Sequence, residues 1–255
     1  AGLKRLAEAI HREGPKVAIQ LTHAGAKATR EFIGEQPVGP SNVVPPKGKE
    51  TPRSLSIVEM EKIATSFGEA ARRAADAGFD AVELHGAHGF LLCQFLSPLT
   101  NRRTDRYGGD LEGRLRFPME VIAEVKRRLG KGIPMFYRFG ADDMVEGGLS
   151  SAQGKLAAAR LEEAGVDVMD ISGGLGGSGH ERFTEKGYFV PLAQGIKEKV
   201  RVPVIGVGNI TEPEYADRIV REGKVDMVAF GHMLLSHPDF PKQAARKLGV
   251  AMAEG

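Results

Sequence analysis

The chain has 255 residues, 42% hydrophobic and 27% charged, which is the composition of an ordinary globular protein and the size of one α/β barrel or two small domains. Its formal net charge of +2 gives no argument for nucleic acid or an anionic membrane as a partner. The sequence contains no run of about 18 apolar residues, so it predicts no membrane-spanning helix. The single cysteine, Cys93, excludes an internal disulfide framework and favours a cytoplasmic location, where thiols stay reduced.

The chain opens with a helical pattern, in which Leu3, Leu6 and Ile10 share one face. Six short apolar runs then predict buried strands at residues 17–21, 80–84, 135–139, 167–171, 204–207 and 226–230. Strands that alternate with helices predict a parallel sheet with right-handed crossovers. We therefore predict an α/β fold of the (β/α)8 TIM-barrel type, with six of its eight βα units visible. The missing pair is expected before Ala1.

Local signals support these boundaries. Three strands begin alike, as AGFDAVEL at 77–84, AGVDVMDI at 164–171 and GKVDMVAF at 223–230, where a glycine ends one helix and a buried strand follows. Three pairs have the spacing of a capping box at a helix start: Ser56 with Glu59, Ser150 with Gln153, and Thr211 with Glu214.

Residues 22–55 contain five prolines and little periodicity. A loop of this length in a compact domain is usually functional. We interpret it as an excursion over the active-site face of a single domain that spans residues 1–255.

Polar residues accumulate where these strands end. Gln20 lies late in the first strand, His85 and His88 follow the second, and Arg138 lies inside the third. Since the active sites of α/β barrels lie at the carboxyl ends of the strands, these residues are candidates for the site.

The last two strands each end near a glycine that precedes a helix. Backbone amides and helix N-termini at such places bind phosphate, so Gly208, Asn209, Gly231 and His232 form a candidate phosphate site. The alternative is that these are ordinary turn glycines.

Arg138 lies in the otherwise apolar run MFYRF at 135–139. A buried arginine needs a partner. Two hypotheses stay open: an ion pair with a core carboxylate, or a permanent cation that faces a cofactor that becomes anionic when reduced.

His85 and His88 have the H-x-x-H spacing of two metal ligands, but no third ligand with convincing spacing accompanies them. Glu83 is expected to face elsewhere. A structural histidine pair is a second alternative. We favour two neutral hydrogen-bond donors directed at a substrate oxygen, and we predict no metal.

The segment 85–98 reads HGAHGFLLCQFLSP and continues as LTNRRTDRYGG to residue 109 and DLEGRLRF to residue 117. With QLTHAG at 20–25 and the glycines of the candidate phosphate site, it resembles the old yellow enzyme family of NAD(P)H:flavin oxidoreductases, in its bacterial and archaeal ene-reductase-like branch. The match covers essentially the whole chain.

The resemblance implies FMN at the barrel mouth, with NADPH or NADH as the reductant. Gln20 would bind the flavin pyrimidine, Arg138 would lie beside the N1 and O2 edge, and Gly208, Asn209, Gly231 and His232 would hold the phosphate. His85 and His88 would donate to the carbonyl oxygen of an α,β-unsaturated substrate, whose β-carbon receives hydride from flavin N5. The expected partners are a small enone-type molecule and further copies of the chain in a homo-oligomer.

Three departures from the family pattern have consequences. Phe90, in the substrate pocket, stands where this branch usually has a proton-donating tyrosine, so the proton would come from solvent or another group. His232 stands where a phosphate-binding arginine is usual, and its charge depends on pH. The first two barrel strands have no counterpart here. Two alternatives to the ene reductase therefore remain: a non-catalytic barrel fragment or scaffold, and another FMN barrel dehydrogenase.

Overall fold

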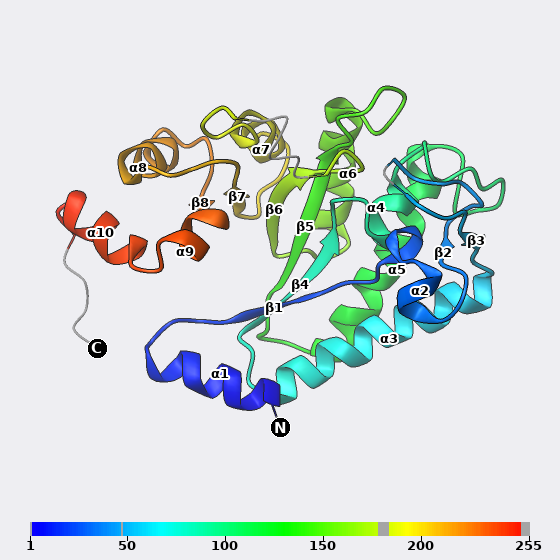
Figure 1. Ribbon diagram of the computed structural model, residues 1–255, viewed down its shortest axis with the longest axis horizontal. Helices are drawn as coiled ribbons and strands as arrows, with labels where there is room; N and C mark the ends of the chain where they lie inside the picture. The colour runs from blue at the N-terminus through cyan, green and yellow to red at the C-terminus, as the bar shows by residue number, and fades with distance from the viewer. Residues whose placement is uncertain (1, 47, 178–183, 251–255) are drawn as a thin grey trace.

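The computed structural model describes residues 2–46, 48–177 and 184–250, and its centre is a six-stranded parallel sheet (Figure 1). The strand order is β1-β4-β5-β6-β7-β8. Their bounds are β1 Ala18–Leu21, β4 Ala81–Gly86, β5 Met135–Asp142, β6 Val168–Gly173, β7 Val204–Gly206 and β8 Met227–Val228. All six predicted strands are confirmed, although β8 is shorter than expected. The sheet is open, with β1 and β8 as its edges.

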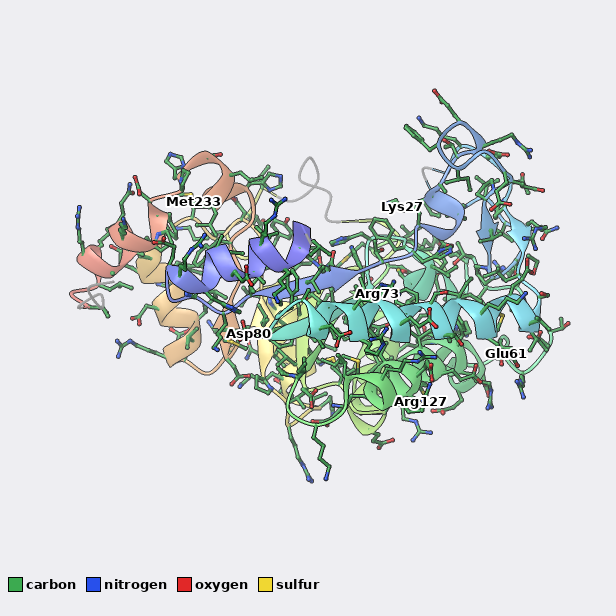
Figure 2. The ribbon with its side chains drawn as sticks, turned by 90° about the horizontal axis from the view of Figure 1, so that it is seen from below. Lys27, Glu61, Arg73, Asp80, Arg127 and Met233 are labelled. Atoms are coloured by element: carbon green, nitrogen blue, oxygen red, sulfur yellow. The ribbon has the colours of Figure 1, made fainter. Side chains whose placement is uncertain are left out.

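Helices alternate with the strands of the sheet, as the pattern predicts. They are α1 (Gly2–Arg12), η1 (Gly25–Lys27), α2 (Arg30–Ile33), α3 (Ile57–Asp76), α4 (Leu91–Leu96), α5 (Leu111–Leu129), α6 (Ser151–Glu163), α7 (Val190–Lys197), α8 (Pro213–Arg221), α9 (His232–Ser236) and α10 (Phe240–Lys247). Helix α1 precedes β1, α9 and α10 follow β8, and the other helices lie between consecutive strands of the sheet. Figure 2 shows α3, with Glu61 and Arg73, beside α5, with Arg127. Within the described ranges, no helix is both long and apolar enough to cross a membrane.

The two faces of the sheet differ in polarity because side chains alternate along each strand. One face packs against helices and forms the core. Its side chains include Leu84, Tyr137, Phe139, Met169 and Ile171, all of which are at most 1% exposed. The opposite face carries Gln20, Glu83, His85, Arg138 and Asp170.

Two of the three predicted capping boxes are present. Ser56 accepts from the amide of Glu59, and Ser150 accepts from that of Gln153. The prediction for Thr211 is wrong. Helix α8 starts with Pro213 at its first position, with Glu212 as the N-cap and no side-chain cap. Proline is favoured at that position because its missing N–H would have no helical partner.

The proline-rich segment 22–55 folds into short elements, and its residue 47 lies outside the described part of the chain. It holds η1, α2 and a two-stranded parallel sheet of β2 (Val38–Gly39) and β3 (Arg53–Ser54). Arg103 fastens it to the loop after α4, since its guanidinium donates to the carbonyl oxygens of Pro40 and Leu55 at 3.0 and 2.7 Å. The segment lies at the opposite end of the molecule from α9 and α10 (Figure 1).

Close packing between α6 and β5 gives a testable prediction. A Cβ at Gly154 in α6 would lie 1.9 Å from the carbonyl oxygen of Ala141, which is backbone. Gly154→Ala is therefore expected to lower the free energy of unfolding by about 1–3 kcal/mol, even though alanine favours helices.

Gly195→Ala in α7 is the matched control, because its Cβ would meet only the flexible end of Lys155, at 2.6 Å. It should leave stability unchanged or raise it by up to about 1 kcal/mol. Urea denaturation of both variants makes the comparison, and equal effects at the two glycines would contradict the packing described.

Candidate active site

A row of polar side chains lies on the sheet face opposite the one that forms the core. Strand register aligns Gln20 with Glu83, and His85 with Arg138, which in turn aligns with Asp170. Paired residues of neighbouring parallel strands point to the same side of the sheet. Four adjacent strands thus place an amide, a guanidinium, an imidazole and two carboxylates on one face.

Glu83 belongs to this group, so the expectation that it faces away from the histidines is wrong. It is two positions before His85 on the same strand, and residues two apart share a face. Its Oε2 accepts a 2.5 Å hydrogen bond from Nε2 of Gln20. Burial raises the pKa of Glu83, and the bond from Gln20 and the charge of Arg138 oppose that rise.

Arg138 and Asp170 form a loose ion pair. Nε of Arg138 lies 3.7 Å from Oδ2 of Asp170, beyond hydrogen-bond range, and neither this Nε nor Oδ1 of Asp170 has a hydrogen-bond partner among the described residues. Desolvation raises the pKa of Asp170 to about 7, against the charge of Arg138 and with that of Glu83. The ion-pair hypothesis for Arg138 is thereby met in part, while the guanidinium, 27% exposed, still faces the open side of the sheet.

His85 lies at the end of β4 and is 5% exposed. Burial, and then the charges of Arg138 and Lys27, lower its pKa to about 4, so the imidazole is neutral at pH 7. Nδ1 accepts a 3.3 Å hydrogen bond from the amide of Ala87, which leaves Nε2 to carry the proton. His85 thus provides one neutral N–H donor.

His88 lies in the turn after β4 with a φ of 54°, in the left-handed region that few non-glycine residues adopt. Its backbone is held from two sides. The amide donates to the carbonyl oxygen of Gly173 at 3.1 Å, and the carbonyl accepts from Nζ of Lys27 at 2.9 Å. Nε2 lies 2.7 Å from Oγ of Ser172, and burial lowers the pKa of His88 to about 3. The second imidazole is also neutral and is fixed in place.

Phe90 completes the group as the N-cap residue of α4, without a side-chain cap. Its ring centroid lies 4.4 Å from that of His85, and the two histidine rings are 5.0 Å apart. His85, His88 and Phe90 therefore line one continuous patch. Within the described residues, no cluster of three or more His, Cys, Asp or Glu could hold a metal ion.

The predicted phosphate residues follow the neighbouring strands β7 and β8, whose register aligns Gly206 with Val228. Gly208 has a φ of 116°, and a Cβ there would lie 3.0 Å from the amide nitrogen of Phe189. Asn209 is exposed, also has a positive φ, and donates to the carbonyl oxygen of Thr184 at 2.7 Å.

Gly231 and His232 lie at the start of α9 and are both exposed. The adjacency of β7 and β8 puts these residues at the same edge of the sheet as Gly208 and Asn209.

Sequence reasoning missed Glu83, Asp170 and Lys27 as members of this site. For Glu83 and Asp170, the signal was present in the alternation along the strands. Glu83 is two positions from His85, and Asp170 is two positions from Ser172 in a strand that is otherwise apolar. Lys27 gave no such signal, because it follows β1 in a loop and reaches the histidines only through the fold.

These residues fit a flavin. A flavin ring edge requires hydrogen-bond donors, and two are present: the buried Nε of Arg138, which has no hydrogen-bond partner among the described residues, and the exposed amide of Gln20. A phosphate requires a close approach to the backbone, which the tight turn at Gly208 allows.

Comparison with known proteins agrees with this geometry. Residues 1–250 match the model of the NADH:flavin oxidoreductase / NADH oxidase family. The chain is 48% identical over 250 residues to an NADH oxidase of Thermoanaerobacter brockii. The matched region covers 96% of the chain but only 38% of that protein. It is 39% identical to an NADPH dehydrogenase of Bacillus subtilis over 98% of the chain and 72% of the relative.

A solved structure, morphinone reductase in complex with tetrahydroNAD, superposes with a TM-score of 0.81 at 30% identity, over 99% of the chain and 71% of that protein. The predicted TIM-barrel type of fold is confirmed. The chain thus spans well under half of the first relative and about seven tenths of the other two.

The raised pKa of Asp170 gives a prediction about pH. An unfolded aspartate titrates near 3.9, whereas the folded state keeps this proton to about pH 7. Between these values the unfolded chain releases a proton that the folded chain retains, so stability falls as pH rises.

Asp170→Asn cannot lose that proton. Its free energy of unfolding should therefore increase relative to wild type from pH 4 to pH 7 and level off above. Urea denaturation across this range measures it, with the exposed Asp76→Asn as control. A difference that does not change with pH would show that Asp170 is not protonated in the folded protein.

Proposed function

The chain belongs to the NADH:flavin oxidoreductase / NADH oxidase family, the old yellow enzyme family, and we propose on this basis that the protein is an FMN-dependent oxidoreductase that reduces the activated C=C bond of an α,β-unsaturated carbonyl compound. NADH or NADPH is the reductant. One observation carries the substrate assignment: two neutral, buried imidazoles lie beside each other on the sheet face that also carries Arg138. Neutral N–H donors suit the carbonyl oxygen of a substrate, whereas a substrate carboxylate would favour a positively charged side chain.

FMN, when bound, would supply the hydride-transfer chemistry between the nicotinamide and the substrate. The chain's own residues position it. Gln20 and Arg138 hold the pyrimidine edge, and Arg138 stabilises the negative charge that reduction places there. Gly208, Asn209, Gly231 and His232 hold the phosphate. The ion pair with Asp170 is loose enough to leave the guanidinium free to donate to the ring.

His85 and His88 act on the substrate. Nε2–H of His85 donates to the carbonyl oxygen, and His88, oriented by Ser172, provides the second contact. These bonds strengthen as negative charge develops on that oxygen, so they lower the barrier to hydride addition at the β-carbon. Phe90 forms the apolar wall of the pocket.

The same proposal covers the organisation of the chain. Residues 1–255 form a single FMN-binding barrel domain, and segment 22–55 lies over the active-site face. Its attachment to the loop after α4 through Arg103 supports this placement. The homo-oligomer and the cytoplasmic location stay predictions.

The flavin gives a direct test. Purified protein loaded with FMN should show a bound-flavin absorption band that NADPH or NADH bleaches under anaerobic conditions, and cyclohexenone should restore it. Protein that does not take up FMN would favour the non-catalytic scaffold. Bleaching without restoration by the enone would favour another FMN barrel dehydrogenase.

The two histidines give a second prediction. His85→Ala and His88→Ala should each slow the oxidation of reduced flavin by cyclohexenone about 10²-fold, since each removes one donor to the developing oxyanion. His237→Ala, at an exposed position after α9, is the control and should have no effect. Stopped-flow absorbance measures the rate, and an unchanged rate in both pocket variants would remove the histidines from the reaction.

A further inference from the structure

Lys27 is the last residue of η1, the turn that follows β1, and lies where the chain enters segment 22–55 (Figure 2). Its side chain reaches the histidine pocket. Nζ lies 2.9 Å from the carbonyl oxygen of His88 and 4.3 Å from the centroid of the Phe90 ring. A hydrogen bond and a cation–π contact thus hold the ammonium at the pocket wall.

The Phe90 ring links this ammonium to the two histidine rings. Phe90, beneath Lys27, touches the ring of His85, which in turn touches that of His88. The positive charge of Lys27 contributes to the lowered pKa of both histidines, as expected of a cation close to both imidazoles. Lys27, Phe90, His85 and His88 therefore form one cluster, which we call the pocket cluster.

The proposed reaction needs an acid at this place. Hydride addition at the β-carbon leaves an enolate, and the saturated product forms only when the α-carbon receives a proton. The phenyl ring of Phe90 has none to give. His85 and His88 are neutral, and their N–H groups are used on the carbonyl oxygen.

An ammonium is a general acid of ordinary pKa about 10.4, and lysine is among the side chains that serve as proton donors in enzymes. Lys27 is exposed to solvent, so a proton that it gives up can be replaced.

We propose that Lys27 is the residue of the pocket cluster that protonates the α-carbon of the substrate, an inference that rests on the proposed function. After hydride transfer, the electron pair of the enolate forms a C–H bond with a proton of the Lys27 ammonium. The N–H bond breaks, the carbonyl double bond is restored, and the neutral amine takes a proton from water. No further oxidant or reductant is needed.

The test uses FMN-loaded protein that NADPH has reduced under anaerobic conditions, mixed with cyclohexenone and quenched at set times. Lys27→Met should slow the formation of cyclohexanone about 10²-fold or more, because the saturated product forms only after the α-carbon is protonated. Lys27→Arg should be equally slow, because a guanidinium keeps the charge but does not release a proton in proteins. Lys62→Met, at an exposed position of α3, is the control and should match wild type.

The outcomes separate the two proposals. A wild-type rate in Lys27→Met overturns the role of Lys27, and a wild-type rate in Lys27→Arg alone shows that the charge, not the proton, is what matters. Absence of FMN binding or of reduction by NADPH in the wild type would instead count against the proposed function.

A readout without flavin tests the placement itself. NMR titration of the histidine rings should give higher pKa values for His85 and His88 in Lys27→Met than in wild type, with His237 unchanged. No rise at either pocket histidine would place Lys27 outside the pocket and overturn the inference.

Discussion

Two carboxylates and one guanidinium share the polar face of the sheet, opposite the face that forms the core, and their burial constrains what that face can become. Glu83 and Asp170 lose most of their hydration, which raises the pKa of both carboxyl groups. The pair therefore does not carry two full negative charges. Arg138 stays charged but lies 3.7 Å from Asp170, too far for its Nε to donate. An apolar helix packed here would leave these groups without partners, at a cost of several kcal/mol. The face therefore stays available to a polar, planar ligand, as FMN would be.

The rest of the site depends on the ends of the strands. Because parallel strands run in one direction, β1, β4 and β6 end at the same edge of the sheet, and this brings Lys27 and His88, in the segments after β1 and β4, together with Ser172 near the end of β6. The left-handed backbone of His88 is retained because contacts with Gly173 and Lys27 hold it from both sides. Strained backbone of this kind is often found at functional sites, where the surrounding structure stabilises it. The pocket cluster is thus formed by the end of β4, the turn that follows it and the loop after β1.

Much of this could be predicted from the sequence, since buried strands and glycine-ended helices leave local signals. All six strands were found, and the motif around His85 and His88 identified the family. The predictions are wrong at places where two local signals in the sequence point to different structures. Pro213 sets the start of α8, which made the capping box at Thr211 wrong. The prediction for Glu83 is wrong because it rests on the alternation with Leu84 alone. Glu83 and His85 are two positions apart in one strand, so they share a face. Lys27 could not be assigned, because its contact with His88 joins residues 61 positions apart through the fold alone.

The central claim is that the polar face of the sheet holds the flavin, with Arg138 against the ring edge that becomes negative on reduction. The midpoint potential of bound FMN tests it most directly, by spectroelectrochemical titration of wild type, Arg138→Met and Arg138→Lys. We expect Arg138→Met to lower the potential by about 30 mV or more, the equivalent of roughly 1.4 kcal/mol for a two-electron couple. Arg138→Lys, which keeps the charge, should fall between the other two. An unchanged potential in Arg138→Met with FMN still bound would show that the flavin does not lie on this face.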